Sequence, residues 1–446
     1  MALASLMRRL STNRRWGVYF SFNRTVYILL LFTLGKGFQL SIGQVTINLY
    51  VYSLTHDLQF VGICAAMSPL GALLAGVPMG ILADRVGRKP LLIWGGLLTP
   101  LSLILLALST SPLLLITANL VNGFVASPYW VTNLPLLAEN TSDEQRVGAL
   151  AMNNFLLLGV GALGALIGGI VPEVASQLTH QPADATLPLR WGVLAAAFVV
   201  LLPALPLFWV RETPRHPAPV SVPIASVPVG TGERIAEPLN PGAERAAWAA
   251  SRGRWGLIAL FAMLLIPDVL FTTGEGMVVS LEQLFFHLRF LLDLGALGVL
   301  ITVAGVVGGA TSLVAPGLVK RWGQLKMATT MQYLSAPMLV LIGFSPVFLL
   351  AAVAEFMRQI LRGLFEPVYA AFAMESVSAR NRATLSGFYS LTWSIGYSIG
   401  SVLEGFLQDH VSLSASFPVG ALLLLISATL LRVFFGRGKP FLPRAK

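Results

Sequence analysis

The sequence is poor in charge, cysteine and histidine. Only 11% of its 446 residues are charged, whereas an ordinary soluble domain carries about 25%. The single cysteine, Cys64, excludes a disulfide within the chain, and the five histidines lack the spacing of zinc ligands. No Walker-type glycine-rich loop and no Ser/His/Asp set are present, which disfavours a nucleotide-driven pump and a membrane enzyme. We therefore expect no cofactor and no metal.

Apolar residues fill most of the chain instead. They make up 55% of it, and the mean hydropathy is +0.76. A soluble protein of this length cannot enclose so large a core, so much of its surface has to face lipid. The net charge of +10 comes from basic residues scattered over short loops, which form no basic face. We expect the lipid bilayer, and no nucleic acid, as a partner.

Twelve apolar runs approach or exceed the roughly 20 residues that a helix needs to cross a bilayer. Six lie in each half of the chain. This predicts an all-α membrane protein with twelve transmembrane helices in two pseudo-symmetric six-helix bundles. The predicted spans are 25–53, 60–83, 90–109, 112–138, 147–171, 191–210, 256–285, 294–319, 326–344, 347–375, 383–408 and 416–435.

The division of the chain follows from these spans. We expect a cytoplasmic tail, a first bundle, a cytoplasmic linker, a second bundle and a second tail, with bounds 1–24, 25–210, 211–254, 255–435 and 436–446. The tail at the start lacks the apolar core of a secretory signal, so we expect it to be retained. The end of the Pro-rich linker, PGAERAAWAASRGRW, is expected to form a short helix on the membrane surface.

Lysine and arginine indicate the orientation. With the N-terminus in the cytoplasm, 25 of the 30 basic residues fall in cytoplasmic segments, and only Arg190 and Arg289 lie on outer loops. This asymmetry follows the positive-inside rule and places both termini in the cytoplasm. We expect a multi-pass protein of a plasma membrane, the bacterial inner membrane in particular.

A basic loop sequence occurs twice. GILADRVGRK at 80–89 and PGLVKRWGQL at 316–325 each lie between two apolar runs, about half the chain apart. Shorter features recur in the same order: Gly35-Lys36-Gly37 as Gly274-Glu275-Gly276, and Glu139 as Glu375. Repetition in order indicates two duplicated halves, as in transporters built from repeats.

The first loop resembles the signature of the major facilitator superfamily, G-x-L-a-D-R-x-G-R-[RK]. The matching residues are Gly80, Leu82, Ala83, Asp84, Arg85, Gly87, Arg88 and Lys89. The resemblance covers essentially the whole chain and implies a secondary transporter. It also implies a cytoplasmic gate, in which a charge relay of Asp84, Arg88 and Glu139 breaks as the bundles rock. The alternative is a turn that only enforces topology. Lys320 replaces Asp84 in the second copy, so a relay there should be weaker or absent.

Two other patterns of the superfamily are matched in part. The fourth predicted helix has Asn119 where the family usually has arginine. The fifth predicted helix keeps the glycines of drug/proton antiporters, Gly164, Gly168 and Gly169, without their proline. Support for the antiporter type is therefore partial.

Charged residues inside the predicted spans point to the functional centre, because a charge at mid-membrane costs roughly 2.5–3.5 kcal/mol on insertion scales. Lys36 and Glu275 occupy equivalent positions, and Asp268 lies on the same helical face as Glu275. We expect Lys36 to pair with Glu275 or Asp268 between the bundles. A permanent structural ion pair and a snorkelling lysine remain alternatives. Lys36, Asp268, Glu275 and Glu355 are the coupling candidates.

The tenth predicted helix carries a stripe of four charges, Glu355, Arg358, Arg362 and Glu366. Neighbours at this spacing can pair along the helix. The stripe is too costly to face lipid, so we expect it to face the central cavity. Proton coupling, binding of an anionic group by the two arginines and a static network all remain open.

Amide and aromatic side chains complete the predicted cavity wall. They come from the first, fourth and eleventh predicted helices, and are Gln39, Gln44, Asn48, Asn119, Asn122, Trp130, Asn133, Tyr389, Trp393, Tyr397 and Glu404. Such a mixture is typical of a cavity for amphiphiles, although aromatic stripes also serve packing.

These features predict secondary active transport of a small organic solute by alternating access, with the proton as driving ion and a monomer as the unit. Export of amphiphilic compounds, drugs included, is the leading hypothesis. Uptake or facilitated movement of a polar or anionic metabolite and transport of a lipid or lysolipid are the alternatives.

Overall fold

The computed structural model describes residues 22–210, 253–312, 314–378 and 381–436. Within these ranges the regular structure is helical. The first half contains α2 (Arg24–Thr55), α3 (Leu58–Val86), α4 (Arg88–Leu108), α5 (Pro112–Glu139), α6 (Asp143–Asn154), η2 (Phe155–Val160), η3 (Gly161–Leu163), α7 (Gly164–Thr179), α8 (Thr186–Ala204) and η4 (Leu205–Trp209). The second half contains α10 (Gly253–Val279), α11 (Glu282–Phe290), α12 (Leu294–Ser312), α13 (Ala315–Trp322), α14 (Gln324–Phe344), α15 (Phe348–Glu375), α16 (Arg382–His410) and α17 (Ser416–Phe435). Most of the predicted linker, with its surface helix, lies outside the described residues.

Ten of the described spans are long and apolar enough to cross a membrane. α15 and α16 have the length as well, with 28 and 29 residues, but carry more charged and hydroxyl side chains. Together these account for the twelve predicted spans. The largest differences are in the fifth span, which reaches Thr179 and not 171, and in the eighth, where α12 ends at Ser312 and not at 319.

Capping residues determine where several spans begin. The side chain of Asn23 accepts a hydrogen bond from the backbone N–H of Val26 at 2.9 Å, and Asp57 accepts one from Phe60 at 2.8 Å. Both satisfy N–H groups that the first helical turn leaves free. α2 and α3 therefore begin at polar caps that hydropathy alone does not locate.

The fifth span is not a continuous α-helix. A π-helical turn, η2, and a 3-10 turn, η3, separate α6 from α7. The irregular turns lie where this span meets α2, since a Cβ atom on Gly161 would lie 2.7 Å from the Cα of Gly37. Small residues permit such a close approach of two membrane helices.

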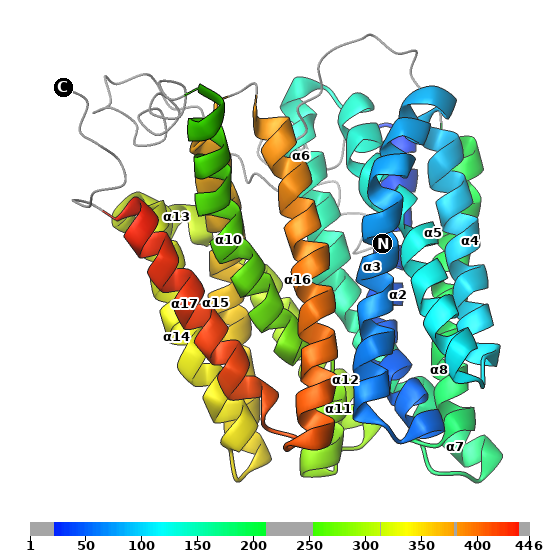
Figure 1. Cartoon of the computed structure of the whole chain (residues 1–446). Helices are drawn as coiled ribbons and strands as arrows, with labels where there is room; N and C mark the ends of the chain where they lie inside the picture. Colours follow the sequence, from blue (N-terminus) through cyan, green and yellow to red (C-terminus); the bar gives the residue numbers. More distant parts are fainter. Residues whose placement is uncertain (1–21, 211–252, 313, 379–380, 437–446) are drawn as a thin grey trace, which may run out of the picture.

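The two bundles repeat one arrangement. α2 packs against α7 and α8, and in the same way α10 packs against α16 and α17. The close glycine contact is repeated too, since a Cβ atom on Gly400 would lie 2.8 Å from the Cα of Gly276. The predicted fold of two related six-helix bundles is confirmed (Figure 1).

The bundles meet through α3 with α16 and through α7 with α12. Contact is close near the 56–57 turn, where a Cβ atom on Gly62 would lie 2.9 Å from the Cα of Gly405. On the other side of the interface, Thr302 Oγ1 donates to the carbonyl of Ala162 at 3.0 Å. We call this the closed end of the molecule.

The same two helices diverge toward the other end, which carries Gly87. Gly80 and Gly387 each lie about five helical turns from the glycine contact, on the same faces of α3 and α16. A Cβ atom on either would meet nothing within 4 Å. The separation of α3 from α16 at this open end is visible in Figure 1.

Candidate functional site

A cluster of charged side chains lies inside the second bundle, around the fully buried Arg358 of α15. Its guanidinium donates to Glu355 through Nε at 2.7 Å and through Nη2 at 2.9 Å. Nη1 donates to Glu275 Oε2 at 3.0 Å, and Nη2 lies 3.4 Å from both carboxylate oxygens of Glu282. One arginine thus joins three carboxyl groups from α10, α11 and α15, which is the arrangement that buried charges need.

Arg362 continues the cluster along α15 as the sequence spacing predicts. Its Nε donates to Glu366 Oε1 at 2.8 Å, and its Nη1 lies 3.6 Å from Glu275 Oε2. The side chains of Arg362 and Glu366 are 26% and 46% exposed. The charged stripe therefore runs from a buried part at Glu355 and Arg358 to an accessible part at Glu366.

Asp268 is a second buried acid of this bundle. Its Oδ2 accepts a hydrogen bond from the hydroxyl of Thr392 on α16. Its Oδ1 has no hydrogen-bond partner among the described residues. Within the same part of the chain no basic side chain forms an ion pair with it, so this carboxyl group differs from those around Arg358.

The predicted pair between Lys36 and an acid of the second bundle is wrong. Lys36 is 2% exposed, and its ammonium donates to Gln39 Oε1 at 2.7 Å, one turn along α2. The neighbouring Gly35 and Gly37 pack against α8 and the η2–η3 region, which fixes the rotation of α2 about its axis. The repeated glycines fix α10 in the same way, so Glu275 pairs inside its own bundle.

Three of the four asparagines predicted for the cavity wall, those of α5, are bonded within the first bundle. Asn119, Asn122 and Asn133 are at most 8% exposed. Asn133 donates to Asn153 Oδ1 at 2.9 Å. Trp130, on the same helix α5, is 51% exposed. Of the four α5 residues predicted for the cavity wall, Trp130 is therefore accessible and the three asparagines are buried. The reason is that the amides find partners among neighbouring polar side chains and backbone carbonyls.

Aromatic residues of α16 do remain accessible. Trp393 is 46% exposed and stacks on Tyr397, with ring centroids 5.3 Å apart and ring planes at 23°. Tyr389 lies 6.1 Å from Tyr369 of α15, measured between ring centroids. The predicted aromatic surface of the eleventh helix is therefore present beside the charged stripe of α15.

The residues predicted to form the cytoplasmic gate lie at the open end. Gly87 has φ 109°, a conformation that favours glycine, and separates α3 from α4. Arg88 at the start of α4 forms an ion pair with Glu139 at the end of α5, and Asp84 lies in the last turn of α3, one turn before Arg88. The structure thus brings Arg88 and Glu139 of the predicted relay together.

The second copy of the loop repeats this geometry with a neutral donor. Gly323 has φ 75° and precedes α14. Gln324, at the position equivalent to Arg88, donates through Nε2 to Glu375 Oε2 at 3.0 Å. A hydrogen bond from a neutral amide thus replaces the ion pair in this copy, and neutral hydrogen bonds are weaker than charge-assisted ones.

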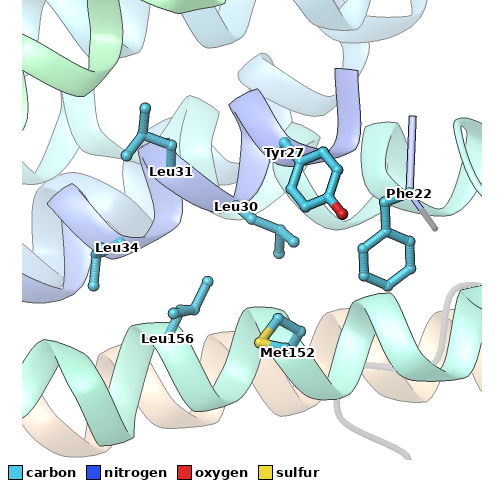
Figure 2. A pocket seen from close by; sticks show the side chains of 7 residues that line it. All are labelled: Phe22, Tyr27, Leu30, Leu31, Leu34, Met152 and Leu156. Carbon is cyan, nitrogen blue, oxygen red and sulfur yellow. The ribbon is translucent and has the colours of Figure 1, made fainter. Parts of the chain in front are cut away.

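An apolar pocket of about 250 Å³ lies between α2 and the α6–η2 region (Figure 2). It is lined by Phe22, Tyr27, Leu30, Leu31, Leu34, Met152 and Leu156. Tyr27, Leu31 and Leu34 lie on one stripe of α2, and the same stripe ends at Asn48. Asn48 Nδ2 donates to the carbonyl of Ser280 in the second bundle at 2.5 Å. The pocket therefore lies on the side of α2 that faces the other bundle.

Comparison with known proteins gives a match over nearly the whole chain. The profile of the Major Facilitator Superfamily matches residues 17–290 and 269–446. The chain belongs to the Major Facilitator Superfamily. Its many apolar helices accordingly form a multi-pass membrane transporter for a small-molecule substrate.

Curated relatives within this superfamily are distant. Human solute carrier family 2, facilitated glucose transporter member 12, is 31% identical over 143 residues, which cover 32% of this chain and 23% of that protein. Multidrug resistance protein 1 of Bacillus subtilis is 23% identical over 358 residues, which cover 78% of this chain and 80% of that protein. The chain thus spans less than a quarter of the glucose transporter's length in the first match.

Solved structures show the same superfamily fold. The nucleoside transporter NupG superimposes with a TM-score of 0.67 at 15% identity, over 92% of this chain and 100% of that one. A bacterial homologue of the human lysosomal transporter Spinster, solved inward-facing and unoccupied, gives 0.66 at 13% identity, over 92% and 95%. At these identities the likeness is one of fold alone.

Sequence reasoning missed two features of this transporter. Glu282 was inside a predicted span of 256–285, and nothing in the sequence marked it as a ligand of Arg358. A helix break at Ser280 and Leu281, without proline or glycine at either position, brings it there. The apolar pocket was missed as well, because its lining comes from two spans and has no polar signal.

Proposed function

We propose that this superfamily member is a proton-coupled exporter of amphiphilic compounds, drugs included. The charge balance inside the second bundle supports this most. Among its described residues one arginine, Arg358, is buried together with five carboxyl groups, Asp268, Glu275, Glu282, Glu355 and Glu404. Acids buried in excess of their counter-ions take up protons or attract cationic groups, because a lone carboxylate is unstable at low dielectric. We place proton coupling among these acids.

The same balance argues against an anionic solute. Binding of an anion was predicted to depend on Arg358 and Arg362. Arg358 already donates to three carboxyl groups, and Arg362 binds Glu366 at 2.8 Å. An anion would have to displace one of these acids, whereas a proton or a cationic group meets carboxylate oxygens directly.

Accessible apolar surface supports an amphiphilic solute. Trp130 and Trp393 are about half exposed, and the pocket beside Leu31 and Leu34 is lined by apolar and aromatic side chains. Flat aromatic rings and adaptable aliphatic groups bind the apolar part of many different molecules. The multidrug resistance protein of Bacillus subtilis, similar over most of its length, adds weak support for drugs.

Alternating access provides the transport step in this proposal. With the basic loops in the cytoplasm, as the positive-inside rule predicts, the open end faces the cytoplasm. Rocking of the bundles would bring Gly80 toward Gly387 and would separate Gly62 from Gly405. The Arg88–Glu139 pair lies at the end that closes. We propose a monomer in the bacterial inner membrane, with both termini in the cytoplasm.

Facilitated movement of a polar metabolite is the second candidate. It is favoured by the 31% identity to the human facilitated glucose transporter, over a segment that covers 23% of that protein. A facilitator would not need the acid excess around Arg358, so this candidate leaves that feature without a role.

Transport by the purified full chain in proteoliposomes separates the two. The probes are ethidium as a cationic amphiphile, anilinonaphthalene sulfonate as an anionic one, and glucose. We expect an imposed pH gradient to drive ethidium against its concentration gradient until a protonophore is added, with no such effect on the anion. Glucose equilibration that ignores the pH gradient, with no driven movement of ethidium, would overturn the exporter proposal.

A further inference from the structure

The seventh span is interrupted close to the contact between the bundles. α10 ends at Val279 and α11 begins at Glu282, although both belong to one apolar span from 255 to 290. The carbonyl of Ser280, in the interruption, accepts the hydrogen bond from Asn48 of the first bundle. Broken membrane helices place backbone and side-chain polar groups where ions and solutes act. The break therefore joins the closed end of the molecule to the charged cluster.

Three carboxyl groups compete for one buried guanidinium at this break. Glu355 holds Arg358 with two short bonds, at 2.7 and 2.9 Å. Glu275 has one bond of 3.0 Å to Arg358 and a second cation, Arg362, at 3.6 Å. Glu282 reaches only Nη2, at 3.4 Å, and that nitrogen already serves Glu355. Glu282 thus has the weakest hold on a cation.

Repulsion between neighbouring carboxylates determines which of the three carboxyl groups is protonated. Glu355 and Glu282 converge on one nitrogen, and both are at most 6% exposed. Two carboxylates so close in a medium of low dielectric cannot both be ionised, so the one with the poorer partner keeps its proton. Glu355 and Glu275 then act as the counter-ions of the arginines.

The surroundings of Glu282 provide no further cation among the described residues. Glu275 of α10, Glu355 and Arg358 of α15 and Tyr397 of α16 act on it electrostatically. Glu404 accepts the backbone N–H of Leu281 at 2.9 Å, so a second acid lies at the same break. Gln283, next in the chain, is 2% exposed, and neither atom of its amide group has a hydrogen-bond partner among the described residues. An amide group that is free to form hydrogen bonds thus lies next to Glu282.

We propose that Glu282 is the carboxyl group that takes up and releases the transported proton. It is protonated in the state described here, with the closed end shut. Loss of that proton turns Glu282 into a carboxylate beside Glu355, and their repulsion loosens the break and its contact with Asn48. The inference rests on the proposed proton coupling and assigns that coupling to one residue.

Two isosteric changes within the cluster test this assignment. E282Q imitates the protonated acid, so we expect gradient-driven ethidium transport to fall by about tenfold or more, a usual size for a coupling between two sites. Ethidium counterflow without a gradient should stay within about twofold, because that exchange needs no proton release. E355Q removes the counter-ion of Arg358 instead, so it should weaken driven transport and counterflow together.

Infrared spectroscopy of the purified protein at neutral pH gives a readout that needs no solute. The difference between wild type and E282Q should contain the carbonyl band of a protonated carboxylic acid, and the difference between wild type and E355Q should contain carboxylate bands instead. Carboxylate bands for E282Q, or wild-type driven transport by it, would overturn the assignment. If the wild type itself ignores the pH gradient, the exporter proposal fails separately, and the infrared result still decides the protonation of Glu282.

Discussion

Position 36 in the first bundle and position 275 in the second are equivalent, and each lies between two glycines that fix the rotation of its helix. Lys36 donates to the amide of Gln39 and has no acidic ion-pair partner among the described residues. Glu275 binds two arginines, at 3.0 and 3.6 Å. The first bundle thus encloses a lysine bonded to a neutral amide, and the second encloses a network of ion pairs.

The other buried polar side chains of the two bundles differ in the same way. Thr33, Asn133 and Asn153 form a network of hydroxyl and amide groups in the first bundle, with distances of 2.7 to 3.2 Å. Neutral networks of this kind fix packing, and their hydrogen bonds do not depend on the uptake of a proton. Duplicated backbones have therefore kept one packing scheme and diverged in electrostatics, which is consistent with the proton coupling proposed for the second bundle.

Removal of the central arginine should have the largest effect. Arg358→Met leaves Glu355 without its cation and Glu275 with only the more distant Arg362, and breaking a buried ion pair costs about 3–5 kcal/mol. We expect a large fall in the thermal unfolding midpoint of the purified protein at neutral pH. The fall should shrink as the pH is lowered, because protonated acids no longer need the cation. A midpoint equal to that of the wild type at neutral pH would contradict the ion-pair network.

Exchange of the two loop donors should have an intermediate effect, on transport more than on stability. Arg88→Gln gives the first loop the neutral donor of the second, and we expect gradient-driven ethidium transport to fall several-fold. The unfolding midpoint should hardly change, because partly exposed ion pairs contribute about 0–1 kcal/mol. Gln324→Arg is the matched reverse change and should leave transport close to wild type. Equal losses in both variants would show that the loops do not differ in function.

Removal of the buried positive charge of Lys36 in the first bundle should have the smallest effect. Lys36→Met removes a buried ammonium that has only an amide partner, so we expect stability to change by about 1 kcal/mol or less. Driven ethidium transport should also persist. Glu275→Met, at the equivalent position, is the matched comparison. It should reduce both the stability and the driven transport of ethidium. If transport by Lys36→Met no longer responds to the pH gradient, Lys36 is a coupling residue after all, and the proposed division between the bundles is wrong.

Much of the fold could be predicted from the sequence. Apolar runs gave the twelve helices, and the doubled loops gave the two bundles, because both depend on local composition and on the order of features along the chain. The spacing of Glu355 and Arg358 also predicted their bond, since residues three apart share a helical face.

Rotation and breaks of helices could not be predicted in the same way. The wrong partner for Lys36 came from placing equivalent positions opposite each other, whereas Gly35 and Gly37 turn the residue between them into its own bundle. Glu282 was missed because the break at Ser280 and Leu281 depends on tertiary contacts, among them the bond from Asn48. Neither effect has a periodic signal in the sequence.

The glycine contact of α3 with α16 has a consequence for the balance between the two orientations of the carrier. Backbone meets backbone at Gly62 and Gly405, so one added methyl group there acts as a wedge at the closed end. The same methyl group at Gly80 or Gly387 finds open space in this orientation and obstructs only the opposite one. These four glycines therefore affect the balance between the two orientations. Alanine at Gly62 or Gly405 should disfavour the orientation described here, and alanine at Gly80 or Gly387 should disfavour the opposite one.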